Sequence, residues 1–255
     1  MIRARKRFGQ HFLHDPGVLR RIVDAMDPRP GERVVEIGPG RGALTLPLLK
    51  RCGRMEAIEI DRDLAPLLAA RAEGLGELVI HVADVLEVDF RALHGAGPKL
   101  RVCGNLPYNI STPLLFHLLD SREVIGDMHF MLQKEVVDRI VAPPGGKVYG
   151  RLTVMLAAAC SAESLFRVGR GAFQPPPAVD SAVVRLVPHA ADPFPLPDRA
   201  RFARLVAAAF SMRRKTLRNS LRGLIDAGQF AAAGIEADRR PETLAPAEFA
   251  RLAAL

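Results

Sequence analysis

The chain has 255 residues, 49% of them hydrophobic and 25% charged, a balance that excludes intrinsic disorder and supports one large domain or a domain with a smaller companion. Its formal net charge of +8 favours a polyanionic partner. Three widely spaced cysteines without a C-x-x-C pair indicate a reducing cytoplasm and argue against a disulfide framework or a metal site, and no apolar run reaches the ~18 residues that a membrane helix needs.

The chain begins with a basic segment, residues 1–14, that we expect to form an arm. It carries Arg5, Lys6 and Arg7, followed by G-Q-H-F-L. It lacks the apolar stretch and the cleavage site of a secretory signal. From Asp15 the apolar residues are spaced as in an amphipathic helix, which the P-R-P-G sequence at 28–31 ends.

Strands and helices then alternate, which is typical of a parallel sheet with helices on both faces. We predict buried strands at 33–38, 55–60, 78–84, 100–105 and 129–133. Helical patterns separate the strands at 43–52, 63–72 and 112–120. The fold class is therefore α/β.

The alternation changes in the second half of the chain. We expect, in order, a loop, a helix and two strand-like runs, at 143–150, 151–159, 164–168 and 182–187. Two strands without an intervening helix suggest an antiparallel edge. After a proline-rich break at 188–198 the patterns are helical only. We therefore place the catalytic domain at 15–188 and a small helical domain at 189–255.

Three polar features mark the ends of the first three predicted strands. The loop E-I-G-P-G-R-G at 36–42 contains Gly38 and Gly40, which let a ligand approach the backbone next to a helix start. Glu59 ends the second strand, where a carboxylate accepts from two ribose hydroxyls, and Asp84 ends the third, where it accepts from an adenine amine. Together they predict an adenosine site, whereas the glycine loop alone also suits an ordinary tight turn.

The stretch V-C-G-N-L-P-Y-N-I-S at 102–111 ends the fourth strand beside this site. The side-chain oxygen of Asn105 and the carbonyl of Leu106 would accept the N–H hydrogens of an adenine amine and free its lone pair for attack on a methyl sulfonium. Pro107 would fix the backbone, and Tyr108 would stack on the base, a contact worth about 1–3 kcal/mol. The alternative is a turn that merely contains these residues.

Several of these motifs together carry a resemblance to a known family. E-I-G-P-G-R-G, I-E-I-D at 58–61 and G-N-L-P-Y-N-I-S at 104–111 resemble the ribosomal RNA adenine N6,N6-dimethyltransferases, specifically the KsgA-type enzymes of the small subunit. The likeness runs through nearly the whole chain. It implies a Rossmann-like, seven-stranded sheet of the class I S-adenosylmethionine-dependent methyltransferases, with a small C-terminal all-helical domain.

The resemblance also implies roles for individual residues. The cofactor, S-adenosyl-L-methionine, would be bound by Gln10, His11, Leu13, Gly38, Gly40, Glu59, Asp84 and Asn105. The segment F-Q-P-P-P-A-V-D-S at 173–181 matches a family motif in which Phe173 faces Tyr108 across the target base. The implied reaction dimethylates N6 of two adjacent adenosines in the loop of the 3′-terminal hairpin of 16S rRNA, with a role in small-subunit biogenesis. The implied partner is this RNA in an immature 30S subunit, and we expect a cytoplasmic monomer.

The segment M-R-R-K-T-L-R-N-S-L at 212–221 also matches the family. Arg214, Arg218 and Arg222 are spaced by four residues and would form one basic stripe on a helix, either solvated or in contact with phosphate. The residues predicted to bind RNA are Arg5, Lys6, Arg7, Arg213, Arg214, Lys215, Arg218 and Arg222. Target adenines must lie in a loop or be unstacked, because A-form helices hide their bases.

Other functions compete with this one. A dimethyltransferase acting on large-subunit RNA would use the same site. A dinucleotide oxidoreductase is disfavoured by the G-x-G-x-G spacing and by N-L-P-Y, and ATP hydrolysis by the lack of G-K-[ST]. A non-catalytic assembly factor would keep the site without using it.

Overall fold

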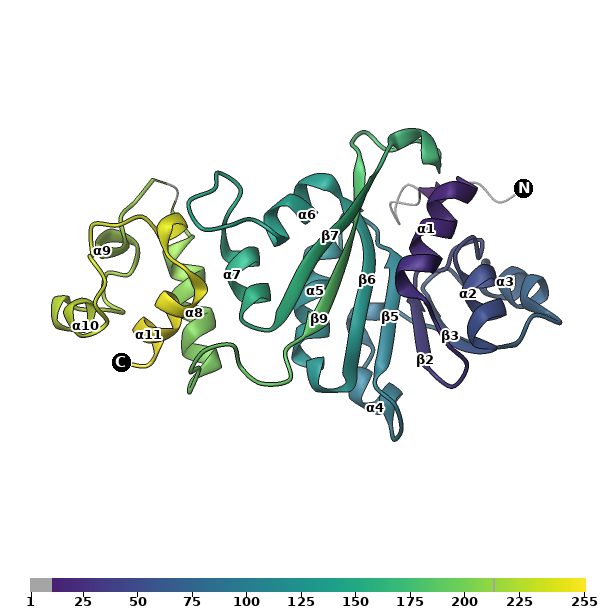
Figure 1. Ribbon diagram of the computed structural model, residues 1–255, viewed down its shortest axis with the longest axis horizontal. Helices are drawn as coiled ribbons and strands as arrows, with labels where there is room; N and C mark the ends of the chain where they lie inside the picture. Colours follow the sequence, from purple (N-terminus) through teal and green to yellow (C-terminus); the bar gives the residue numbers. More distant parts are fainter. Residues whose placement is uncertain (1–10, 213) are drawn as a thin grey trace. The chain divides into compact units, whose positions relative to one another are not determined.

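The computed structural model describes residues 11–212 and 214–255. Its main feature is a twisted seven-stranded sheet, visible in Figure 1. Across the sheet the strands follow the order β4 (Glu77–Val82), β3 (Arg54–Glu59), β2 (Arg33–Ile37), β5 (Leu100–Asn105), β6 (Ile125–Gln133), β9 (Ser181–Pro188) and β7 (Cys160–Val168). The first five of these are parallel, and β9 runs antiparallel to β6. The two strand-like runs predicted in the second half of the chain, β9 and β7, lie next to each other at this edge of the sheet.

The central strands are buried, as their apolar sequences require. Val34 and Val35 of β2 and Val102 of β5 are at most 1% exposed. Parallel strands covered on both faces have continuous apolar sequences, and this is why the sequence predicted their positions. The β6 strand begins at Ile125, earlier than its predicted start at 129.

The α-helices lie between and after the strands. They are α1 (Pro16–Met26), α2 (Thr45–Cys52), α3 (Ala65–Ala72), α4 (Phe90–His94), α5 (Ser111–Asp120), α6 (Lys134–Ile140), α7 (Arg151–Ala157), α8 (Arg199–Ala209), α9 (Leu217–Ser220), α10 (Ala227–Ala232) and α11 (Pro246–Ala253). Asp15 caps α1 by accepting from the Val18 N–H at 2.8 Å. The α4 helix was not predicted; Asp89 caps it by accepting from the N–H groups of Arg91 and Ala92.

A second, two-stranded sheet brings distant segments together. In it β1 (Phe12–Leu13) runs antiparallel to β8 (Phe173–Gln174). The end of the predicted N-terminal arm is therefore part of the fold. Two-residue strands carry no periodic pattern, so the sequence does not indicate this pairing.

The chain divides into two compact units. Of the described residues, the first contains those up to Val137 together with Glu163–Pro188, and the second contains those in Asp138–Ala162 and His189–Leu255. The prediction placed 138–162 in the catalytic domain, whereas in the structure this segment belongs to the second unit. The reason is the apolar core of that unit, where Tyr149 and Val154 are buried in one cluster with residues of α8 and α11. None of the helices in the described residues has the length and apolarity needed to cross a membrane.

Candidate active site

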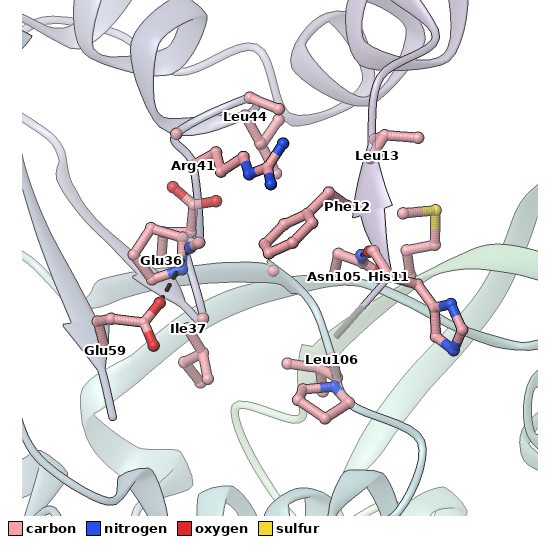
Figure 2. A pocket seen from close by; sticks show the side chains of 18 of the residues that line it. His11, Phe12, Leu13, Glu36, Ile37, Arg41, Leu44, Glu59, Asn105 and Leu106 are labelled. Carbon is pink, nitrogen blue, oxygen red and sulfur yellow. Dashed lines mark hydrogen bonds between the residues drawn. The ribbon is translucent and has the colours of Figure 1, made fainter. Parts of the chain in front are cut away.

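A cavity of about 680 Å³ lies in the first unit, lined by the ends of β2, β3 and β5, the segment after β4, and β1. Figure 2 shows the glycine loop and Glu59 on one side of it and Asn105, Leu106 and His11 on the other. The residues that the sequence predicted and that line the cavity are His11, Leu13, Gly38, Gly40, Glu59, Asp84, Asn105, Leu106, Pro107 and Tyr108. The motifs are far apart in the chain, and the parallel sheet brings them to one edge.

The glycine loop after β2 requires its glycines. Gly38, Gly40 and Gly42 have φ values of 66°, 55° and 78°, in the left-handed region that residues with a Cβ rarely adopt. A Cβ on Gly42 would lie 2.5 Å from Cδ1 of Leu68, while one on Gly38 would have no heavy atom within 4 Å. Gly42 is therefore needed for packing, and Gly38 faces open space that a ligand can fill.

Glu59 is 4% exposed and holds the glycine loop in place. Its Oε2 accepts from the Gly40 N–H at 3.0 Å, the bond drawn in Figure 2, and its Oε1 accepts from the Asp61 N–H at 2.9 Å. Burial raises the pKa of the Glu59 carboxyl, although these two backbone bonds oppose the shift. Each carboxylate oxygen keeps a second lone pair, so Glu59 can still accept from ribose hydroxyls.

Asp84 follows β4 and is only partly buried. Its Oδ1 accepts from the Leu86 N–H at 3.0 Å and caps the 3-10 helix η2 (Val85–Glu87). The cap fixes the orientation of the carboxylate while its other oxygen can accept from a ligand. This is the position in which the sequence predicts a contact with the adenine amine.

Glu36 was not singled out by the sequence, yet it lines the cavity with only 2% of its surface exposed. Burial raises the pKa of this carboxyl to about 7, helped by the charge of Glu59 and opposed by a hydrogen bond from Thr45. The Thr45 hydroxyl donates to Oε2 at 2.6 Å. Near neutral pH this carboxyl in the wall of the cavity is therefore protonated in part of the molecules.

Asn105 ends β5 and contacts the N-terminal segment. Its Nδ2 donates to the His11 carbonyl at 2.9 Å. The bond settles which end of the amide is which, so the side-chain oxygen remains an acceptor for another group. The backbone of the next residue is fixed as well, because the Leu106 N–H donates to the Met131 carbonyl of β6 at 3.1 Å.

Tyr108 lines the cavity with its hydroxyl anchored. The oxygen lies 2.9 Å from Oγ of Ser181, at the start of β9. Burial raises the pKa of the Tyr108 phenol, so the hydroxyl is neutral at physiological pH. The ring of His11 is stacked on Tyr108, with centroids 5.8 Å apart and planes at 26°.

Phe173 does not face Tyr108 in this structure, as the family resemblance implies that it does. It is 2% exposed, does not line the cavity, and belongs to the apolar core of the first unit. The cause is the pairing of β1 with β8, in which Phe173 is opposite Leu13 and is drawn into the core. His11, and not Phe173, is the ring that faces Tyr108 in this structure.

The basic residues of the second unit correct another expectation. The predicted helical stripe of Arg214, Arg218 and Arg222 is absent, because helix α9 covers only Leu217–Ser220. Arg214 has a φ of 66°, and Gly223 has a φ of 80° just after the helix, so the segment cannot continue as an α-helix. Residues 214 and 215, like Arg222, lie outside α9. Arg5, Lys6, Arg7, Gln10 and Arg213 lie outside the described residues.

Arg218 already forms an ion pair with Asp238. Its Nε and Nη2 donate to Asp238 at 3.0 and 3.3 Å, in an ion pair exposed to solvent. A phosphate would therefore have to replace a carboxylate at this position.

A partly buried polar network lies near the start of β5, away from the cavity. Arg101 donates twice to Asp127, at 2.8 and 2.9 Å, and once to Glu32 at 2.6 Å. The neighbouring His129 lines the cavity and is 2% exposed, with its Nδ1 3.8 Å from Asp127. Burial lowers the pKa of His129 to about 4, so the ring is neutral at physiological pH.

Sequence reasoning also missed two residues that close the cofactor side. The Phe12 ring packs on the glycine loop: a Cβ added to Gly40 would lie 3.1 Å from it. The guanidinium of Arg41 lies over the same ring, 4.4 Å from its centroid. Phe12 lies between two predicted residues and Arg41 between two loop glycines, but no pattern in the sequence shows that they meet.

The lining residues fit S-adenosylmethionine. Gly38 leaves room beside the backbone, while Glu59 and Asp84 provide separate acceptors for the ribose and the adenine. The apolar side of the cavity, which includes Leu13 and Leu44, suits the rest of such a ligand.

The comparisons with known proteins agree with this chemistry. A sequence profile of the family described as Ribosomal RNA adenine dimethylase matches residues 1–255. Ribosomal RNA small subunit methyltransferase A of Nitrosococcus oceani is 55% identical over 250 residues, which cover 98% of this chain and 95% of that protein. The protein of the same name from Xanthomonas campestris pv. campestris is 56% identical, with the same coverage.

Two solved structures share the fold over nearly the whole chain. A dimethyladenosine transferase from Plasmodium falciparum has a TM-score of 0.82 and 27% identity, and the match covers 95% of this chain and 96% of that chain. The 23S rRNA methyltransferase ErmE has a TM-score of 0.75 and 25% identity, with coverages of 95% and 98%. The predicted class I methyltransferase fold is thereby confirmed.

Proposed function

Because the chain belongs to the ribosomal RNA adenine dimethylase family, we propose that it dimethylates N6 of two adjacent adenosines in the loop of the 3′-terminal hairpin of 16S rRNA. Dimethylation of ribosomal RNA adenine with S-adenosylmethionine is the activity of the family to which it belongs. Beyond this family activity, we propose which RNA is methylated, where the two adenosines lie in it and which residues act on them.

The observation that carries the proposal is the state of Asn105. Its Nδ2 is occupied by the His11 carbonyl at 2.9 Å, which leaves the side-chain oxygen to accept from a substrate. We propose that this oxygen and the Leu106 carbonyl each accept a hydrogen bond from one N–H of the target amine. An amine held in this way is pyramidal. Its lone pair is then no longer delocalised into the adenine ring and is free to attack the methyl group.

The methyl transfer needs no strong base in the site. The cofactor, when bound by Gly38, Glu59 and Asp84, supplies an electrophilic methyl group on a sulfonium. As the N–C bond forms and the S–C bond breaks, N6 becomes cationic and acidic, so it loses one proton to solvent or to a cavity acceptor. Tyr108 holds the base in line, because its hydroxyl is fixed to Ser181.

The second methylation follows from the neutral charge of Asn105. The monomethylated amine has only one N–H hydrogen left. A neutral amide oxygen that loses its donor incurs a smaller penalty than a carboxylate would in the same place. The pocket can therefore accept the intermediate and methylate it again.

The degree of identity supports the small subunit as the target. The relatives that are 55% and 56% identical are named as small-subunit methyltransferases, whereas ErmE, named as a 23S rRNA methyltransferase, is 25% identical. We propose that the substrate is an immature 30S subunit, that the enzyme acts in the cytoplasm as a monomer, and that it takes part in small-subunit biogenesis. The basic residues at 5–7 and at 213–222 would bind RNA phosphates.

Labelled S-adenosylmethionine tests the proposal with three substrates: unmethylated 30S particles, unmethylated 50S particles and protein-free 16S rRNA. We expect labelled dimethyladenosine from 30S particles only. Label in 50S particles would move the target to the large subunit, and monomethyladenosine as the sole product would contradict dimethylation.

A pair of variants separates catalysis from folding. Asn105→Ala should lower the methylation rate at least about 100-fold, because orientation of the amine is lost. Glu77→Ala serves as the control: it removes an exposed ion pair with Arg54, at the start of strands whose other ends meet the cavity. An Asn105→Ala protein with full activity would rule out the proposed mechanism.

A further inference from the structure

The described part of the N-terminal arm, residues 11–14, forms a strap along the cavity. Phe12 is paired with Gln174 in the small sheet, and the His14 N–H donates to the Ala172 carbonyl at 2.9 Å. Towards the glycine loop the Phe12 ring packs against Gly40. The strap therefore joins the cofactor side of the cavity to the side that holds Asn105, as Figure 2 shows.

On the side of the cavity where the target adenine would bind, the His11 ring has a defined position. Its plane is stacked on Tyr108, with centroids 5.8 Å apart. Its Nδ1 lies 2.9 Å from the Pro175 carbonyl, and its own carbonyl accepts from Asn105. The ring is thus held through its backbone, one nitrogen and one face.

This geometry leaves no space for a base between the two rings. Stacked aromatic centroids lie at least about 4.5 Å apart, so a base inserted between His11 and Tyr108 would need about 9 Å. The observed separation is 5.8 Å. An adenine and the His11 ring cannot contact this face of Tyr108 at the same time.

We propose that the His11 imidazole is a placeholder for the target adenine: it covers the cavity face of Tyr108 in the RNA-free chain and leaves when the base binds. The inference rests on the proposed function. It makes His11 a positioning residue for the base, a role beyond the cofactor contact that the family resemblance implies for it.

The chemistry of the ring suits this exchange. In the RNA-free chain the flat imidazole shields the apolar face of Tyr108 from water. A purine is larger, so it makes more contact with this face when it replaces the imidazole. The hydrogen bond to Pro175 is exposed, so both of its groups are hydrated again when the ring leaves. The Tyr108 hydroxyl stays bound to Ser181, so the platform itself need not move.

Two substitutions with opposite stacking strength test the exchange. His11→Ala removes the competing ring and should lower the KM for unmethylated 30S particles roughly threefold to tenfold. His11→Trp covers more of Tyr108 and should raise that KM by a similar factor. The Kd for S-adenosylmethionine, measured without RNA, separates these effects from any change at the cofactor. If the role of His11 were purely structural, both substitutions would raise the KM for 30S particles, and that result would overturn the inference.

Histidine ring resonances give a readout that needs no RNA. In the free chain the His11 ring protons should lie upfield because of the Tyr108 ring current, and Tyr108→Leu should remove this shift. An unshifted His11 in the free chain would overturn the inference even if 30S particles are methylated. A shifted His11 in a chain that methylates no RNA would instead refute the proposed function and leave the stacked contact intact.

Discussion

Tyr108 combines two interactions that substitution can separate. Its ring offers a stacking face, and its hydroxyl lies 2.9 Å from the Ser181 hydroxyl. Tyr108→Ala should reduce kcat/KM for 30S particles roughly 5- to 150-fold, which corresponds to the loss of about 1–3 kcal/mol of stacking. Tyr108→Phe keeps the face and loses one hydrogen bond, so the reduction should be only about 2- to 10-fold. Equal losses in the two variants, measured with labelled cofactor, would show that the hydroxyl and not the ring matters.

Glu36 makes folding stability depend on pH. Burial raises its pKa to about 7 in the folded chain, from 4.5, so the folded state binds more protons between these two values. Stability from this group is therefore fully present below about pH 4.5 and is lost as the pH rises through 7. The upper limit of the change is about 3.5 kcal/mol, since each pKa unit corresponds to about 1.4 kcal/mol.

Replacing the carboxyl with an amide tests this dependence. Glu36→Gln still offers an oxygen to the Thr45 hydroxyl but does not ionise. The free energy of unfolding of the variant minus that of the original chain should be larger at pH 7.5 than at pH 5. Urea unfolding at the two pH values measures this difference. The same difference between the two proteins at both pH values would mean that Glu36 does not titrate in this range.

At the scale of elements, the contact between β2 and β5 depends on Gly104. A Cβ on this residue would lie 2.4 Å from the carbonyl oxygen of Ile37, and a backbone atom inside a sheet cannot move aside. Gly104→Ala should therefore reduce the free energy of unfolding by about 1–3 kcal/mol. Gly126 of β6 is a matched control, because its Cβ would meet Lys99 at an ordinary 3.4 Å. Urea unfolding of both variants checks the difference, and equal stabilities would contradict the clash.

The segment around α9 leads to a prediction about charge. Arg218 is paired with Asp238 in solvent, so it must exchange that carboxylate for a phosphate if it binds RNA as proposed. Asp238→Asn should strengthen RNA binding and steepen the slope of log affinity against log salt by up to about 0.7. The control is Asp192→Asn, which also removes one carboxylate from an ion pair, with Arg199. Equal effects of the two variants would indicate only a change in net charge.

The sequence predicts the elements of the molecule better than their connections. The buried strands are continuous apolar runs, and Glu59, Asp84 and Asn105 follow or end them, so both the sheet and the site could be inferred. The pairing of β1 with β8 could not, because two residues have no period. That pairing explains why His11 and not Phe173 faces Tyr108.

Two further errors came from treating local patterns as sufficient. Leu217 and Leu221 are buried four residues apart, as a helix requires. The left-handed conformations of Arg214 before the helix and Gly223 after it nevertheless confine it to a single turn. Periodicity reports which residues face the core, not how far a helix continues. Likewise, the proline-rich break after 188 is real, but composition does not show that the earlier segment 138–162 packs with the residues beyond that break.

At the scale of the whole molecule, the composition of the second unit predicts that the chain cannot be cut at residue 188. A fragment 1–188 would keep Tyr149 and Val154 but lose the apolar residues of α8 and α11 that share their core. The Tyr149 hydroxyl would also lose the Leu244 carbonyl, to which it donates at 2.7 Å. Exposed apolar surface of this kind promotes association.

We therefore expect the fragment 1–188 to bind a hydrophobic dye and to sediment as aggregates, with the full chain as the control. Each described residue that lines the cavity belongs to the first unit and lies before residue 188. The fragment therefore loses solubility but keeps these lining side chains. A monomeric fragment that binds no dye would mean that 138–162 folds without the C-terminal helices. It would also restore the boundary that the proline-rich break suggested.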